Sequence, residues 1–261
     1  MSDTSVTWWG HSTMWLADSG VTLLTDPLLT DRLAHLKRIA GTSPALRGAP
    51  DAVLLSHLHA DHCHVPSLRA VPGTPLFVVP RGAGNFIARS LGRAAGDRCV
   101  ELAPGEQTTV GGVTVHAVPA AHPGGRAPWS RLEAVALGFV VAGAARTWYA
   151  GDTGLFDGMA DLGPLDLALV PVGGWGPTLH AHGHLDAERG AEALRRVRAR
   201  WAVPVHYGTF WPIGLSRFRR HMFTDPGADF ARIARTVAPD SQVRVLDQGG
   251  TLTINLAGDQ M

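Results

Sequence analysis

The segment Asp51-Ala52-Val53-Leu54-Leu55-Ser56-His57-Leu58-His59-Ala60-Asp61-His62 carries the strongest signal in the sequence. It begins as an apolar run of strand length and ends in a crowd of polar side chains. Because side chains two residues apart in an extended segment point the same way, we expect His57 and His59 to converge on one point. Pro66 suits the first turn of a helix, so the chain should turn there and bring Asp61 and His62 to a second point nearby.

Two imidazoles at one point, and a carboxylate with an imidazole at the other, suit two adjacent ions of the zinc type. The alternative interpretation is a surface loop that happens to contain histidine. A complete His-x-His-x-Asp-His pattern directly after an apolar strand arises by chance far less often than a single His-x-His pair. We therefore interpret the segment as a metal-binding motif.

Length and composition predict an ordinary globular protein. The chain has 261 residues, of which 45% are hydrophobic and 17% charged, and its formal net charge is +1. This is enough for a sizeable core, and no low-complexity linker divides the chain, so we expect a single domain over residues 1–261. The near-neutral charge gives no general attraction to nucleic acid or anionic membranes.

The sequence also predicts a cytoplasmic location. The first residues lack the basic and then apolar regions of a signal peptide, and no apolar run approaches the roughly 18 residues of a membrane span. The two cysteines, Cys63 and Cys99, are too few for a disulfide framework. Cys63 lies inside the histidine-rich segment, which favours a reducing compartment.

Strand-like segments alternate with helical ones, an organisation that favours sheets covered by helices. Residues 28–50 show no clear period and are expected to form a long connection of the kind that is often functional. Helices are expected from about Pro66, over 83–91, from a cap at Asp186 to about Arg200, and over 228–237. Strands are expected at 6–9, 14–17, 21–25, 52–56, 76–79, 99–102, 107–110, 113–118, 134–141, 146–150, 165–170, 202–205, 243–246 and 251–255.

Further polar residues stand where apolar strands end. Asp152 follows a glycine at a sharp strand exit, a position well placed to bridge two ions. His11 and Asp26 also stand at strand ends, where such residues often form turns. Neutral imidazole and carboxylate suit zinc, iron or manganese. Four separated strand ends thus supply seven candidate metal ligands: His57, His59, Asp61, His62, His122, Asp152 and His206.

This pattern resembles the metallo-β-lactamase superfamily, and within it the N-acyl-phosphatidylethanolamine phospholipase D-like hydrolases and the ascorbate-phosphate lactonase-like proteins. The resemblance covers most of the chain, from near residue 8 to near residue 215. The stretches that carry it are Trp9-Gly10-His11-Ser12, Leu24-Thr25-Asp26-Pro27, Leu55 to His62, Tyr149-Ala150-Gly151-Asp152-Thr153-Gly154 and Val205-His206-Tyr207-Gly208-Thr209-Phe210.

The resemblance implies an α/β fold, a four-layer αββα sandwich of two mixed sheets flanked by helices, with the metals at one edge. By the family pattern, His57, His59 and His122 hold the first ion. Asp61, His62 and His206 hold the second ion, and Asp152 bridges the two. His11 and Asp26 are then expected to orient ligands by hydrogen bonds.

Two more positions follow from the same resemblance. His184 is expected to line the pocket near the leaving group. Many relatives carry an acidic residue at the position of His64, and a histidine does not supply the same negative charge, so the metal preference is open.

The implied activity is hydrolysis of a phosphodiester by a hydroxide that two divalent ions activate, with Zn²⁺ expected first and Mn²⁺ or Fe²⁺ as alternatives. Asp61 and His184 are the expected catalytic residues. The substrate is expected to be a small or lipid-derived molecule, in a pocket walled by the segments that contain Trp129, Trp175 and Trp211. Oligomerisation is left open.

Four other functions are weighed against this one. A lactonase or esterase of a small, even phosphorylated, metabolite is the main alternative. A nuclease is disfavoured by the near-neutral charge and the lack of an appended nucleic-acid module. A non-catalytic metal-binding scaffold need not keep a complete ligand set with a bridging position, and a redox diiron protein would carry a ligand set richer in carboxylates.

Overall fold

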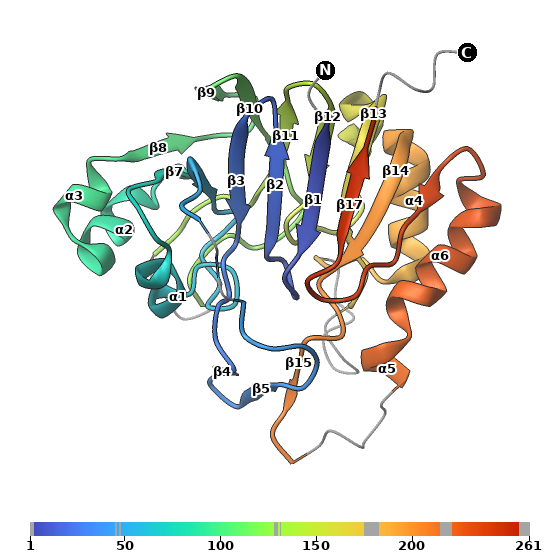
Figure 1. Cartoon of the computed structure of the whole chain (residues 1–261), viewed down its shortest axis with the longest axis horizontal. Helices are drawn as coiled ribbons and strands as arrows, with labels where there is room; N and C mark the ends of the chain where they lie inside the picture. Colours follow the sequence, from blue (N-terminus) through green and yellow to red (C-terminus); the bar gives the residue numbers. More distant parts are fainter. Residues whose placement is uncertain are drawn as a thin grey trace.

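The computed structural model describes residues 3–44, 46, 48–127, 130, 132–174, 183–214 and 221–255. Two seven-stranded sheets lie face to face, each with parallel and antiparallel pairs (Figure 1). The first sheet has the order β17-β1-β2-β3-β6-β7-β8. Its strands are β1 (Thr4–Trp8), β2 (Met14–Asp18), β3 (Val21–Thr25), β6 (Ala52–Leu54), β7 (Leu76–Pro80), β8 (Cys99–Leu102) and β17 (Thr251–Ile254).

The second sheet has the order β16-β14-β13-β12-β11-β10-β9. Its neighbouring strands β12, β13 and β14 are parallel to one another, which brings their carboxyl ends to the same edge. The strands are β9 (Gln107–Val110), β10 (Val113–Pro119), β11 (Leu137–Ala142), β12 (Arg146–Tyr149), β13 (Leu165–Pro171), β14 (Ala199–Val205) and β16 (Gln242–Val243).

Apolar side chains on both faces of each sheet build three separate layers of core. In β3, Leu23 faces the other sheet while Leu24 faces outward, and Leu167 and Ala168 of β13 divide in the same way. Such alternation follows from the two-residue period of a strand. A strand buried on both faces needs helices on its outer side, and the chain supplies them.

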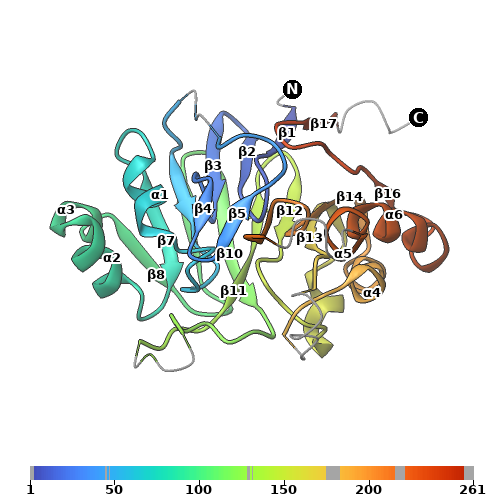
Figure 2. The same cartoon turned by 90° about the horizontal axis from the view of Figure 1, so that it is seen from below.

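Helices cover both outer faces and complete the αββα sandwich that the sequence predicts. The first sheet is covered by α1 (Val65–Ala70), α2 (Gly84–Leu91) and α3 (Arg93–Gly96), and the second by η1 (Asp157–Leu162), α4 (Ala187–Val197) and α6 (Pro226–Val237). The short helix α5 (His221–Thr224) precedes α6. Figure 2 shows the two groups of helices on opposite sides of the paired sheets.

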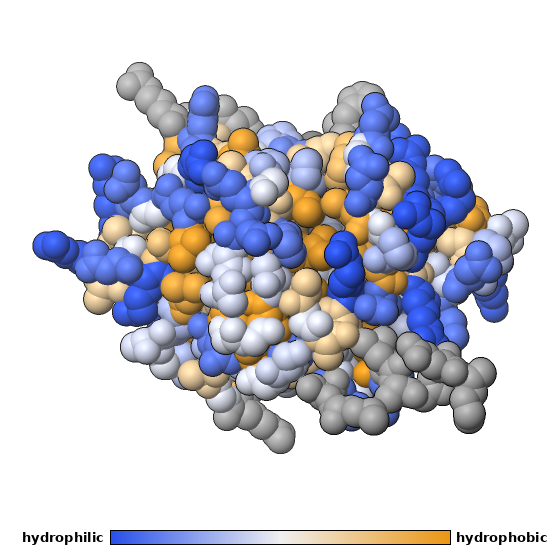
Figure 3. Space-filling model, turned by 90° about the horizontal axis from the view of Figure 1, so that it is seen from above, coloured by the Kyte–Doolittle hydropathy of each residue, from blue (hydrophilic) through white to orange (hydrophobic). Residues whose placement is uncertain are grey.

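A third, three-stranded sheet lies against one edge of the sandwich. It has the order β15-β5-β4 and consists of β4 (Arg32–Leu33), β5 (Leu36–Arg38) and β15 (Phe210–Pro212). Figures 1 and 2 place it below the edge at which β1, β3 and β14 end. On the opposite face, hydrophilic residues alternate with small apolar areas, as on an ordinary water-exposed surface (Figure 3).

Three local expectations were wrong. The connection over 28–50 contains the β4–β5 hairpin, because a strand far along the chain pairs with it. The helix expected to reach Arg200 ends at Val197, since Arg198 adopts a left-handed conformation and β14 begins at the next residue. The strand expected over 243–246 ends at Val243.

Candidate metal centre

The strand β6 delivers the first ligand cluster to the edge of the sandwich. Its three residues are fully buried, and the chain after them turns tightly, because the backbone N–H groups of His62 and Cys63 both donate to the carbonyl of His59. This turn brings Asp61 and His62 back toward the strand end. The second point of convergence expected from the sequence therefore arises from a backbone turn that precedes α1.

His57, His59 and His122 form one group of imidazoles. Nε2 of His57 lies 3.0 Å from Nδ1 of His59, and Nε2 of His122 lies 3.1 Å from the same atom. Nitrogens bound to one tetrahedral zinc at about 2.0–2.1 Å stand about 3.3 Å apart, so this spacing suits a shared cation. Nδ1 of His122 lies 2.8 Å from the carbonyl oxygen of Gly183, which fixes the ring with Nε2 facing the group.

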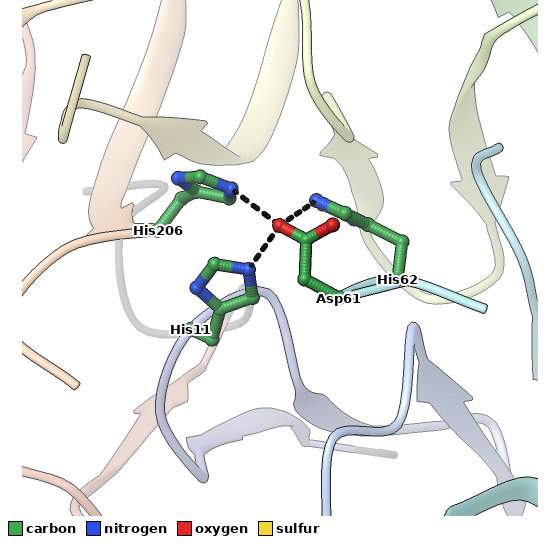
Figure 4. Close-up of side chains that lie close together, drawn as sticks. All are labelled: His11, Asp61, His62 and His206. Carbon is green, nitrogen blue, oxygen red and sulfur yellow. Dashed lines mark hydrogen bonds and ion pairs between the residues drawn. The ribbon is translucent and has the colours of Figure 1, made fainter. Parts of the chain in front are cut away.

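Asp61, His62 and His206 form the second group, with His11 beside them (Figure 4). Oδ2 of Asp61 lies 3.1 Å from Nε2 of His11, 3.6 Å from Nε2 of His62 and 3.9 Å from Nε2 of His206. These four residues come from the β1–β2 turn, the loop after β6 and the end of β14. The structure thus brings together three segments that are far apart in the sequence.

Asp152 borders both groups, because one of its carboxylate oxygens lies within 4.8 Å of a ring nitrogen of His122 in the first group. Its Oδ2 is 3.2 Å from Nε2 of His62, and its Oδ1 is 3.2 Å from Nε2 of His206. Among the described residues, these two nitrogens and Oδ1 of Asp152 are buried without a hydrogen-bond partner. Buried polar atoms without a partner are unfavourable, and three of them that point at one another suit the binding of a shared cation.

His184 borders Asp152 and His122 on the more open side of the site. Its Nδ1 lies 3.6 Å from Oδ2 of Asp152, and its ring packs edge-on against that of His122. Its side chain is 19% exposed, against 2% for Asp152. Burial lowers the pKa of His184 to about 4, so the imidazole is neutral at pH 7 and carries one N–H donor.

A buried carboxylate, Asp26, supports the ligands from behind. Its Oδ2 accepts hydrogen bonds from Ser56 Oγ and Tyr149 Oη, each at 2.5 Å, and lies 2.7 Å from Nδ1 of His62. Its Oδ1 accepts the backbone N–H of Ser56 at 2.8 Å. This arrangement orients His62 with Nε2 toward the site, the role that the sequence suggested for Asp26.

Burial and the neighbouring carboxylates set the charges of the site. Burial holds the pKa of His57 well below its ordinary value, which favours the neutral, metal-binding form of the ring. Burial also opposes protonation of His62, but Asp152, Asp61 and Asp26 outweigh it and raise the pKa of His62 well above the ordinary value. The surplus of negative charge around His62 is the field that a divalent cation would neutralise.

The side chain of His64 contacts a serine of α1. Its Nδ1 lies 2.7 Å from Oγ of Ser67, which accepts the backbone N–H of Leu29. The residue immediately precedes α1 and connects that helix to the segment after β3. The buried negative charge behind the ligands comes from Asp26.

Three residues that support the candidate ligands were not predicted from the sequence. Ser56 and Tyr149 stand inside recognised motifs, but only the fold shows that both donate to Asp26. Arg126 donates to the carbonyls of Leu58 at 2.9 Å and Cys63 at 2.7 Å, and so fastens the loop of His122 to the first cluster. Nothing in the sequence around Arg126 signals this contact.

The expected pocket walls are described only in part. Trp129 and Trp175 lie outside the described residues. Trp211 belongs to β15, is partly buried and packs edge-on against Phe223 at 5.4 Å. Within the described ranges, none of the helices has both the length and the hydropathy needed to cross a bilayer.

Comparison with known proteins identifies the superfamily. Residues 22–207 match the beta-lactamase superfamily domain known as Lactamase_B_2. A UPF0173 metal-dependent hydrolase of Hyperthermus butylicus is 31% identical over 212 residues, which cover 78% of this chain and 84% of that protein. The chain spans 59% of the length of uncharacterized mycobacterial relatives, with which it shares 34% identity over 228 residues.

Two further similarities bear on activity and fold. The N-acyl-phosphatidylethanolamine-hydrolyzing phospholipase D 1 of Caenorhabditis elegans is 30% identical over 236 residues, or 81% of this chain and 65% of that enzyme. The structure of Igni18, a metallo hydrolase of Ignicoccus hospitalis, superposes with a TM-score of 0.72 at 21% identity, covering 97% of this chain and 99% of that one. The chain therefore belongs to the metallo-β-lactamase superfamily.

Proposed function

We propose that the chain hydrolyses a phosphodiester with two divalent cations, Zn²⁺ being expected first and Mn²⁺ or Fe²⁺ being alternatives. The observation that carries this proposal is the convergence of imidazole and carboxylate side chains into two groups that Asp152 links. His57, His59 and His122 would hold the first ion, and Asp61, His62 and His206 the second. Asp152 borders both groups, since it contacts His62 and His206 of one and lies near His122 of the other, and a carboxylate in that place suits a pair of ions.

Bound there, divalent cations supply Lewis acidity and lower the pKa of water. The protein's own residues then determine orientation. We assign Asp61 to orient the attacking water, because its carboxylate is 14% exposed while His11 holds one of its oxygens. We assign His184 to donate a hydrogen bond to the oxygen that gains negative charge, because its neutral ring is reachable from outside.

The name of the C. elegans relative supports a phosphodiester, and a lipid-derived one in particular, as the substrate. Hydrolysis of a lactone or ester would use the same centre, because its tetrahedral intermediate also places an oxyanion near such donors. A non-catalytic scaffold is the remaining reading. The partial exposure of Asp61, His122 and His184 speaks against it, since a purely structural metal site is closed.

Elemental analysis of the purified protein, with assays on bis(p-nitrophenyl) phosphate and on a simple lactone, tests the proposal. We expect about two metal ions per chain, and phosphodiester turnover that rises with added zinc or manganese. His59→Ala should lose metal and activity together. The matched control is His221→Ala, because the His221 side chain is exposed on α5 away from the ligands.

Each other outcome has a defined meaning. Turnover of the lactone alone would replace the phosphodiesterase assignment with a lactonase. Protein that binds metal but turns over neither substrate would favour the scaffold, and protein that binds none of zinc, manganese and iron would contradict the metal centre itself. A His59→Ala variant with full metal content and full rate would contradict the ligand assignment.

A further inference from the structure

A buried arginine lies next to the metal centre without touching any ligand. The side chain of Arg38, at the end of β5, is 1% exposed. Among the described residues, its carboxylate partner is Asp31, at 3.8 Å and 70% exposed. Burial lowers the pKa of the Arg38 guanidinium, and Asp31 opposes this only in part. A buried cation with so weak a counterion is costly, so its retention calls for a role other than stability.

The guanidinium donates to four acceptors in three other segments of the chain. Its Nη2 donates to the carbonyl of Leu28 at 2.9 Å, and its Nε to that of Thr30 at 3.2 Å. Its Nη1 donates to the carbonyl of Trp9 at 3.4 Å and to Oε1 of Gln248 at 3.2 Å. The planar fork of an arginine can reach several acceptors at fixed angles, and a lysine cannot replace it.

Gln248, which accepts a hydrogen bond from Arg38, also donates to the turn that follows His206. Its Nε2 donates to Oγ1 of Thr209 at 3.1 Å and to the carbonyl of Gly208 at 3.4 Å. The orientation of the amide is fixed, because the guanidinium only donates and the carbonyl of Gly208 only accepts. Thr209 Oγ1 in turn accepts the backbone N–H of His11 at 2.7 Å.

The turns that contain His11 and His206 both have strained backbones, and a hydrogen bond joins them. His11 has φ +50° and His206 has φ +61°, a left-handed conformation that is unfavourable for side chains other than glycine. The N–H of His206 donates to the carbonyl of His11 at 2.9 Å, and the two rings lie 4.0 Å apart. Such a conformation persists only where the surroundings enforce it.

The side chains of Arg38, Gln248 and Thr209 are closely packed against Gly10. A Cβ added to Gly10 would meet Arg38 Nη1, Gln248 Oε1 and Thr209 Cγ2, each at 2.9 Å. Arg38 also lies over the ring of Phe210 at 4.8 Å, and that ring meets His11 edge-on at 6.1 Å. The guanidinium thus reaches His11 by two routes, one through hydrogen bonds and one through Phe210.

We propose that Arg38 is a positioning residue that, through Gln248 and Thr209, holds the His11 and His206 turns with both imidazoles facing Asp61. The inference rests on the proposed metal centre, because it assigns Arg38 to the half-site of Asp61, His62 and His206. The group of His57, His59 and His122 has no contact with Arg38 among the described residues. The β4–β5 hairpin is thereby coupled to one half of the centre.

Three variants separate positioning from a general structural role. Arg38→Met keeps the length and removes every donor. Arg38→Lys keeps the charge without the fork. Gln248→Glu keeps the acceptor for Arg38 but removes the donor to Thr209, so it tests the path even where the Arg38 variants fold poorly. The matched control is Arg32→Met, in the same hairpin, whose residue is exposed.

The first measurement is calorimetric titration of the metal-free protein with Zn²⁺. In all three variants we expect one binding step to weaken by about tenfold or more, as for other residues behind metal ligands, and the other step to stay at the parent value. Equal weakening of both steps, parent-like binding, or full restoration by lysine would overturn the inference. Arg32→Met should match the parent.

The second measurement needs no metal. Amide hydrogen exchange of His11 and His206 in the metal-free protein should accelerate by about tenfold or more in Arg38→Met and Gln248→Glu, while amides of the β12–β13 pair stay unchanged. Unchanged exchange at both histidines would overturn the inference. If the parent protein binds none of zinc, manganese and iron, the proposed function fails, and the exchange result alone decides the role of Arg38.

Discussion

Replacement of Tyr149 by phenylalanine tests the support behind the ligands. The hydroxyl, in a residue that is 1% exposed, donates to the fully buried carboxylate of Asp26 at 2.5 Å. Burial, followed by the charge of Asp26, raises the pKa of Tyr149 well above its ordinary value, so the hydroxyl keeps its proton. Tyr149→Phe removes this one hydrogen bond and little volume.

The size of the effect follows from the partners that remain. A hydrogen bond to a charged group contributes about 1.5–3 kcal/mol. Asp26 keeps Ser56 and His62 after the change, so no buried charge is left unpaired and the lower part of that range applies. We expect a loss of about 1.5–2 kcal/mol in the free energy of unfolding, or a Tm lower by about 3–8 °C for a chain of this size.

Urea unfolding of metal-free protein, followed by tryptophan fluorescence, measures this loss. The chain has one other tyrosine, Tyr207, which is the matched control. Its hydroxyl makes no hydrogen bond within the described part of the chain, and its ring stacks on Trp8 in either variant. Tyr207→Phe should therefore change the stability by less than about 0.5 kcal/mol. A Tyr149→Phe variant within 0.5 kcal/mol of the parent would refute the reasoning.

Two further predictions concern pH and thiol chemistry. Hydrogen bonds from Arg195 and Arg196 lower the pKa of Glu192 from 4.5 to about 2, so this ion pair stabilises the fold above pH 4.5 and is lost as the pH falls toward 2. In urea denaturation, Glu192→Gln should lower the free energy of unfolding by less than about 1 kcal/mol at pH 7, and the loss should be smaller at pH 3. An equal loss at the two pH values would contradict this prediction. Burial raises the pKa of Cys63 to about 12 and that of Cys99 to about 11. A thiol reagent at pH 8 should therefore label both cysteines rapidly only when urea has unfolded the protein. Rapid labelling of Cys63 in the folded protein would contradict its burial.

The candidate ligands could be identified from the sequence because they follow buried strands, β6 for the first cluster and β10, β12 and β14 for the other three. Apolar runs identify such strands without knowledge of their neighbours, and the residue at the exit is then conspicuous, as for Asp152 after β12 and His206 after β14. That these strand ends lie close together in space was implied by the family resemblance. The structure adds the spacing of the side chains and the buried partners behind them.

The β4–β5 hairpin was not predictable in the same way. Its strands are two and three residues long, too short to show a period, and β5 pairs with β15, which comes more than 170 residues later. The hydrogen bond from Tyr149 to Asp26 joins one sheet to the other, and no local pattern reports a contact between sheets. The end of α4 was misplaced because Arg198 takes the left-handed conformation that glycine usually signals.

The central claim is a centre of two metal ions at the edge of the sandwich, linked by Asp152. Anomalous X-ray diffraction at the zinc absorption edge, on crystals of zinc-loaded protein, tests it most directly. The account predicts two peaks, one among His57, His59 and His122 and the other among Asp61, His62 and His206, with Asp152 in contact with both. A single peak, or two peaks away from Asp152, would contradict it.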